Sequence, residues 1–238
     1  MFSLLTNLFL VGISGLLVGA AVGRGAYRHY SHRMEELYLL CGGMLIGVIV
    51  FELIPESMHS FEPMGILLGA LLSFLLFVLI EASFHNRLVH NKYVPVIAFV
   101  FALLSHSIPV GVAIGINGDG GEFGGVLLLA LFIHHIPEGV ALVLFMAISG
   151  LKSRYSILAA ALISFALVLS AALGTHVAPS YTVNGFLTGV AIGSLSYVAW
   201  YEIILKVKGR VFLRTLFLYI SMGILIIVTY MKIVHKLF

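Results

Sequence analysis

Charged residues are scarce in this sequence. Lys, Arg, Asp and Glu together make up 10% of its 238 residues, whereas a soluble domain carries about 25%. Hydrophobic residues reach 61% and the mean hydropathy is +1.13, so the chain has too little polar surface to face water. The scarcity of charge excludes a soluble domain and indicates a lipid bilayer as the solvent.

Cysteine is almost absent as well. Cys41 is the only one, which excludes an intramolecular disulfide, and its apolar neighbours favour the role of a small buried hydrophobic residue. No basic residue precedes the first apolar run, as a cleaved signal peptide would require, so we expect this run to remain as a helix. The basic residues are scattered singly without forming a stripe, and we expect no nucleic-acid partner.

Long apolar runs dominate the chain. A hydrocarbon core of about 30 Å requires about 20 apolar helical residues, and eight runs approach that length. We therefore predict an all-α polytopic membrane protein, with one domain over residues 1–238 and eight transmembrane helices. The predicted spans are 4–23, 37–58, 64–84, 94–117, 124–149, 155–178, 184–205 and 211–233.

Lysine and arginine are divided unevenly between the loops. The first, third, fifth and seventh loops carry almost all of them, and the second, fourth and sixth carry none. Because basic loops stay on the cytoplasmic side, the pattern predicts a multi-pass protein of the cell membrane with both termini extracytoplasmic. Lys232 and Lys236 are the exceptions, but C-terminal ends are weak determinants of orientation.

The second and seventh predicted helices contain similar segments. Residues 41–54, from Cys-Gly-Gly-Met to Phe-Glu-Leu-Ile, align with residues 191–204, from Ala-Ile-Gly-Ser to Tyr-Glu-Ile-Ile. The two helices cross the membrane in opposite directions, and inverted repeats that meet at the bilayer midplane are typical of transporters. Glycine-rich apolar helices also resemble one another by composition alone, and this alternative stays open.

Helices four and five carry ionisable residues near the middle of apolar spans. His106 stands three positions before Pro109, and His134 three positions before Pro137; each proline is followed by x-Gly-Val-Ala. Ionisable groups at this depth are costly and usually functional. A proline there frees a backbone carbonyl, which is tolerated where protein, water or an ion takes it up.

The spacing decides which of these residues share a helix face. His134 and Glu138 are four residues apart and lie on one face, while His135 is turned about 100° toward a neighbouring helix. If helices four and five pack antiparallel with their prolines level, His106 joins the first face. Imidazole and carboxylate groups suit Zn²⁺ and other first-row divalent ions. Met44 offers a thioether, although core packing is the simpler explanation for one methionine.

Each of these residues also has a structural explanation. A single histidine in a membrane is more often a hydrogen-bond partner between helices, but several that converge with a glutamate favour a metal. Glu52 and Glu202 occupy equivalent places in the repeat, and we interpret them as entrance and exit carboxylates, two to three helical turns from the site. Interfacial capping is their alternative, and for Glu56 it is as good an explanation as function.

At these residues the chain resembles the ZIP (Zrt/Irt-like) family of divalent metal transporters. The resemblance rests on Gly-Gly-Met and Phe-Glu-Leu-Ile-Pro-Glu-Ser in helix two, both His-Pro motifs, and Gly-Ser-Leu-Ser-Tyr-Val-Ala-Trp-Tyr-Glu-Ile-Ile in helix seven. It implies an eight-helix bundle with both termini outside, a homodimer, and import of a divalent metal toward the cytoplasm. The metal ligands that it implies are Met44, His106, His134, His135 and Glu138.

The sequence departs from the family pattern in the fourth helix. Ser107 stands where the family has an asparagine, and Val110 where it has a bridging glutamate. Helix six has no carboxylate either. These departures favour a site for one metal ion rather than two. With Glu138 as its only carboxylate, such a site would leave about one positive charge of the ion uncompensated, so we expect weak binding.

We therefore predict a transporter that carries a divalent cation, with zinc favoured, as substrate rather than as a cofactor. A transport-inactive, metal-sensing or scaffolding protein is an alternative that Val110 leaves open. An intramembrane metalloenzyme is the other alternative. It is disfavoured because its usual His-Glu-x-x-His motif is absent and no separate general base stands beside the predicted site.

Overall fold

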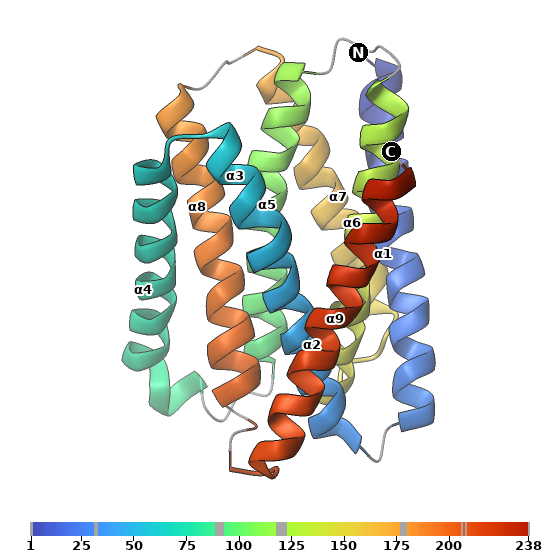
Figure 1. Ribbon diagram of the computed structural model, residues 1–238, viewed down its shortest axis with the longest axis vertical. Coiled ribbons are helices and arrows are strands. Elements are labelled where there is room, and N and C mark those ends of the chain that lie inside the picture. The colour runs from blue at the N-terminus through green and yellow to red at the C-terminus, as the bar shows by residue number, and fades with distance from the viewer. Residues whose placement is uncertain are drawn as a thin grey trace.

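The computed structural model describes residues 2–30, 33–88, 93–117, 123–176, 180–205, 207 and 209–237. These residues form long helices that stand side by side (Figure 1). In chain order they are α1 (Phe2–Tyr30), α2 (Met34–Val48), η2 (Ile49–Leu53), α3 (Ile54–Ser60), α4 (Pro63–Leu88), α5 (Val94–Asn117), α6 (Phe123–Ile148), α7 (Tyr155–Gly174), α8 (Tyr181–Tyr197), η3 (Val198–Leu205) and α9 (Leu213–Leu237). The segments η2 and η3 are π-helical and continue the helices before them.

The helices have the length and apolarity of membrane spans. Within the described residues, seven helical segments are long and apolar enough to cross a membrane. This confirms the prediction of an all-α polytopic membrane protein. The remaining predicted span, the fifth at 124–149, falls in α6, where Leu131–Ala147 forms a shorter apolar helix. Part of its beginning lies outside the described side chains, so the count of eight stays a prediction.

Several helix boundaries differ by a few residues from the predicted ones, and for two of them the structure shows a physical reason. The first helix continues to Tyr30, past the predicted end at 23, because a helix that leaves the hydrocarbon keeps its backbone bonded while Arg24 and Arg28 extend their long side chains outward. The sixth predicted span, 155–178, ends earlier, at Gly174 of α7. There the Thr175 hydroxyl donates to the Ala172 carbonyl at 2.7 Å and satisfies the last turn.

The helices pack as four close pairs: α1 with α6, α5 with α7, α4 with α8, and α2 with α9. The pairs assemble into two groups, one of α1, α5, α6 and α7 and the other of α2–α3, α4, α8–η3 and α9. Contacts of α5 with α8 and of α2 with α6 join the groups. Any site built on α5 and α6 is therefore open to side chains from α2.

The pairing pattern is the one that an inverted repeat requires. In such a repeat α1, α2–α3 and α4 correspond to α7, α8–η3 and α9, and α6 corresponds to α5. The contact of α1 with α6 then matches that of α7 with α5, and the contact of α4 with α8 matches that of α9 with α2. Both π-helical segments fall at equivalent places in the repeat, around Glu52 and Glu202. Composition alone would not produce matching π-helical segments, so the structure supports the repeat.

Glycines bring the backbones of α1 and α6 together. At Gly15 an added Cβ would lie 2.5 Å from the Phe132 carbonyl oxygen and 2.9 Å from the Cβ of His135. At Gly19 it would meet the Ile136 carbonyl oxygen, and at Gly23 it would come within 2.8 Å of a carbonyl oxygen of α6. Small residues spaced four apart allow this close approach in membranes. They hold the segment of α6 that carries His134, His135 and Glu138.

A methyl group at this contact should destabilise the bundle. We expect Gly19→Ala to cost about 1–3 kcal/mol, the usual penalty of overpacking, because backbone atoms of Ile136 and Gly139 stand in the way. Gly25→Ala is a matched control on the same helix, since a Cβ there meets nothing within 4 Å. Thermal unfolding in detergent should show a lower midpoint for Gly19→Ala alone; equal midpoints would contradict the close packing.

Figure 1 shows both chain ends toward the same end of the bundle. The basic loops predict that this end is extracytoplasmic, and cysteine labelling tests it. Ser180→Cys should react with an impermeant thiol reagent added to whole cells, and Lys152→Cys should react only after permeabilisation. Both positions are exposed, and the native Cys41 is 1% exposed and contributes little background. The opposite pattern of labelling would invert the orientation.

Candidate metal centre

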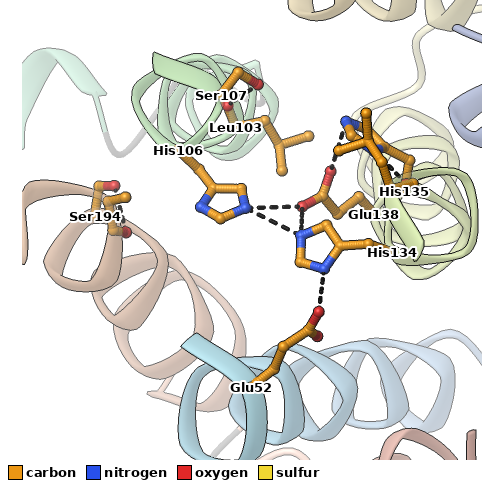
Figure 2. Close-up of polar contacts among 10 residues, drawn as sticks. Glu52, Leu103, His106, Ser107, His134, His135, Glu138 and Ser194 are labelled. Carbon is orange, nitrogen blue, oxygen red and sulfur yellow. Dashed lines mark hydrogen bonds and ion pairs between the residues drawn. The ribbon is translucent and has the colours of Figure 1, made fainter. Parts of the chain in front are cut away.

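Three side chains from two helices converge in the interior of the bundle. His106 comes from α5, and His134 and Glu138 come from α6, four residues apart as the spacing predicts (Figure 2). The Nε2 atoms of the two histidines are 3.0 Å apart. Oε1 of Glu138 lies 3.2 Å from Nε2 of His134 and 3.8 Å from Nε2 of His106. The structure thus places His106 beside the face of α6 that carries His134 and Glu138.

The three atoms form a triangle of the size that a metal ion requires. In a tetrahedral zinc site with bonds of about 2.0–2.1 Å, neighbouring ligand atoms lie about 3.3–3.4 Å apart. The observed separations of 3.0, 3.2 and 3.8 Å bracket this value. One ion at equal distance from the three atoms would leave its fourth position free. A transported ion needs such an open position, because it must exchange ligands to enter and leave.

Glu52 contacts the same cluster from the other group of helices. Its Oε1 lies 2.7 Å from Nδ1 of His134, and Figure 2 shows it reaching His134 from a separate helix. A carboxylate only accepts, so Nδ1 of His134 must carry the proton and donate it. In the neutral imidazole this leaves the lone pair on Nε2, which faces His106 and Glu138. Glu52 thus favours the tautomer whose Nε2 is able to coordinate a metal, the arrangement in which carboxylates orient metal-ligating histidines.

This position of Glu52 differs from the interpretation of it as an entrance carboxylate two to three turns from the site. The physical reason is tertiary. The π-helical turn Ile49–Leu53 changes the rotation of the chain, and α2 packs on α6 at this level. The signal that could have found it was already in the sequence, because a glutamate inside an apolar span is itself a candidate for function.

His135 lies on the other side of Glu138. Its Nδ1 donates to the Leu131 carbonyl oxygen at 2.7 Å, so its lone pair is on Nε2, which is 4.0 Å from Oε2 of Glu138. One oxygen of Glu138 therefore faces the His106 and His134 pair, and the other faces His135. The 100° turn between His134 and His135 produces this arrangement.

The cluster is almost completely enclosed. His106 and Glu138 are each 4% exposed, and the side chain of His134 is 11% exposed. A carboxylate buried at this depth is costly unless it is paired or coordinates a metal. Glu138 has only imidazoles within ion-pair distance among the described residues. A divalent cation would complete its charge balance.

The structure does not bring the fourth-helix residues Ser107 and Val110 into the cluster. The Ser107 hydroxyl donates to the Leu103 carbonyl at 2.8 Å, and the Ser107 carbonyl accepts from Ser170 of α7 at 3.3 Å. Figure 2 shows Ser107 turned away from Glu138. Val110 packs on a separate apolar cluster that includes Leu8. The position where the family resemblance leads one to seek a second carboxylate is therefore apolar here.

The remaining predicted residues lie elsewhere or outside the described part of the structure. Met44 is buried in the apolar core of α2, about 12 Å from Glu52 by the helical rise, and its role as a ligand stays a prediction. The side chains of Glu56 and Glu202 are outside the described residues, although their backbones lie in α3 and η3. The roles assigned to them stay predictions as well.

Comparison with known proteins identifies the family of this chain. The protein named "Putative zinc transporter" of Arabidopsis thaliana is 26% identical over 209 residues, which cover 82% of this chain and 34% of that protein. Zinc transporter ZIP3 of Bos taurus is 29% identical over 144 residues, which cover 57% of this chain and 46% of that protein. The chain thus spans less than half the length of either relative. The model of the ZIP zinc transporter family matches residues 85–231, a range that holds both His-Pro motifs, and the chain belongs to this family.

Proposed function

We propose that this protein carries a divalent metal cation across the membrane and that Zn²⁺ is the ion its site fits best. The observation that supports this most directly is the triangle of His106 Nε2, His134 Nε2 and Glu138 Oε1 inside membrane-spanning helices. A site enclosed by apolar helices and open at one coordination position suits an ion in transit. The curated relatives are named zinc transporters, which agrees with this proposal.

The charges around the site support a dication. Glu138 lies within the cluster and Glu52 lies behind it, against Nδ1 of His134, so one carboxylate faces an ion with two positive charges and a second lies on the far side of the His134 ring. The sequence alone predicts one carboxylate and one uncompensated charge. Because Coulomb interactions are strong in a dry interior, the second carboxylate removes the reason to expect weak binding. The negative charge missing at Val110 is thus supplied by a carboxylate from another helix, which acts through His134.

The direction of transport that we propose is the one that the family resemblance implies. If the basic loops face the cytoplasm, the proposal is import toward the cytoplasm in a multi-pass protein of the cell membrane. The homodimer implied by the family resemblance is part of the same proposal. Cross-linking in native membranes would detect it.

Flux measured in proteoliposomes is the direct test. Purified protein is reconstituted into vesicles loaded with a zinc-sensitive dye, and Zn²⁺ is added outside. We expect a zinc-dependent dye response that saturates with Zn²⁺ and is lost in His134→Ala. Glu35→Gln is the matched control, since Glu35 is exposed and lies outside the site. Zinc binding without flux would support the metal-sensing alternative and overturn transport.

The ligand set also predicts selectivity. Imidazole donors favour Zn²⁺ and Cd²⁺, whereas carboxylate-rich oxygen sites suit harder ions such as Mn²⁺. We expect Zn²⁺ and Cd²⁺ to displace Mn²⁺ in equilibrium competition on the purified protein, with the preference reduced in His106→Asp, which exchanges an imidazole for a carboxylate. Mn²⁺ that outcompetes Zn²⁺ in the unmodified protein would show that the two histidines are not the ligands.

A further inference from the structure

A second polar feature lies apart from the metal centre, between α1 and the start of α7. It is a pocket of about 380 Å³. Arg24 and Arg28 line it from α1, and Ser156 and Ile157 line it from α7. No residue of the metal centre contributes to it, so it has to be explained separately.

The charge of the pocket is positive and uncompensated. Arg24 and Arg28 are four residues apart and project from one face of the helix. Neither has an ion-pair partner among the described residues, and neither α1 nor the segment 150–157 contains an acidic residue. The Ser156 hydroxyl already donates to the Ser153 carbonyl at 2.6 Å, so the two guanidinium groups are the free donors. Their planar forks match the oxygens of a phosphate group.

The rest of the pocket is apolar and continuous with the outer surface of the helices. Leu17 and Ala21 line it below the arginines. Ile157 is 54% exposed, and beside the pocket Val22 of α1 and Leu158 of α7 are 55% and 60% exposed. In a membrane-spanning bundle these side chains face acyl chains. A ligand seated here therefore meets two cations at one end and lipid-facing hydrocarbon at the other.

The pocket lies at the level of the membrane interface. Arg24 and Arg28 fall in the last two turns of α1, and the neighbouring Arg154 lies over the ring of Tyr155, 5.2 Å from its centroid. Tyrosine is typical of the boundary between hydrocarbon and water. The distribution of basic loops predicts that this end of the bundle faces the cytoplasm, the leaflet in which anionic lipids are concentrated.

We propose that this pocket binds an anionic membrane phospholipid, with its headgroup phosphate between Arg24 and Arg28 and its acyl chains along the exposed faces of α1 and α7. The apolar floor favours a lipid over a free phosphate ion, which would gain nothing from Leu17, Ala21 or Ile157. The bound lipid would neutralise about half of the charge of two adjacent arginines on the group of helices that carries the proposed metal centre. This proposal does not depend on transport.

Native mass spectrometry of the detergent-solubilised chain tests it, with phosphatidylglycerol and phosphatidylcholine added in parallel. We expect the unmodified protein to retain phosphatidylglycerol in preference to phosphatidylcholine. The double substitution Arg24→Gln with Arg28→Gln should weaken phosphatidylglycerol binding about 30-fold, the combined effect of two basic contacts. Arg214→Gln, which removes an exposed arginine of α9 outside the pocket, should leave binding unchanged.

Two further measurements distinguish a lipid site from a site for a simple anion. Ala21→Trp fills the floor while both arginines remain, and it should also remove the preference, with circular dichroism confirming helical content. Inorganic phosphate at the same concentration should fail to displace phosphatidylglycerol. Equal retention of the two lipids, or unchanged binding in the double variant, would overturn the proposal, and full displacement by inorganic phosphate would make the ligand a free anion.

Discussion

Glu138→Gln is expected to lower zinc affinity more than any other single change in this chain. Glutamine keeps the size of the side chain but removes the charge of the one carboxylate that faces both histidines, at 3.2 and 3.8 Å. Loss of an outer partner of a metal ligand typically costs 10–100-fold in affinity, and loss of a charged ligand in a dry interior should exceed about 100-fold. Isothermal titration with Zn²⁺ on the solubilised protein measures it.

The matched control for this change is Glu35→Gln, the same substitution at an exposed position near the start of α2. It should bind Zn²⁺ as the unmodified chain does, and both variants should have similar helical content. If Glu138→Gln folds and keeps its zinc affinity, the ion is held elsewhere. The convergence of His106, His134 and Glu138 would then be a structural network of hydrogen bonds.

Glu52→Gln should have the second largest effect, and it tests a role that the structure alone assigns. Glutamine still offers an oxygen to Nδ1 of His134, but without charge, so the imidazole is less well oriented and less basic toward a metal. We expect zinc affinity to fall about 10–100-fold, less than in Glu138→Gln. Glu52→Ala should lie at the upper end of that range, because no acceptor remains.

Spectroscopy separates an orienting role from direct ligation. X-ray absorption at the zinc edge should show the same set of nitrogen and oxygen atoms bound to zinc in Glu52→Gln and in the unmodified protein. A missing oxygen ligand in the variant would make Glu52 itself a ligand. Unchanged affinity in both Glu52 variants would show that its 2.7 Å contact with His134 is dispensable, and that Glu52 acts only along the entry path.

The contact between Glu52 and His134 also joins the two groups of helices. Glu52 belongs to the group of α2–α3, α4, α8–η3 and α9, and His134 to the group of α1, α5, α6 and α7. The metal centre is thus completed across their boundary. Any relative displacement of the two groups would change the environment of His134. The effect of Glu52→Gln therefore depends on how the whole bundle packs.

Much of the protein could be predicted without coordinates. The apolar runs predicted a polytopic helical protein because the thickness of the bilayer translates directly into helix length. The pair formed by His134 and Glu138 followed from the helical period, and the turn of His135 away from them followed from the same 100° rotation. The shared His-Pro motifs predicted that His106 would join them. All of these predictions depend on the geometry of a single helix or on a motif that two helices share.

The tertiary structure decided the rest. It brought Glu52 to His134 and left Ser107 and Val110 facing other helices, so the second carboxylate comes from η2 and not from α5. The rotation of one helix against another depends on contacts between distant segments, such as the glycines of α1 on the backbone of α6 and the π-helical turn in the second span. Composition and spacing within a single helix contain no information about that rotation, because it is set where two surfaces meet.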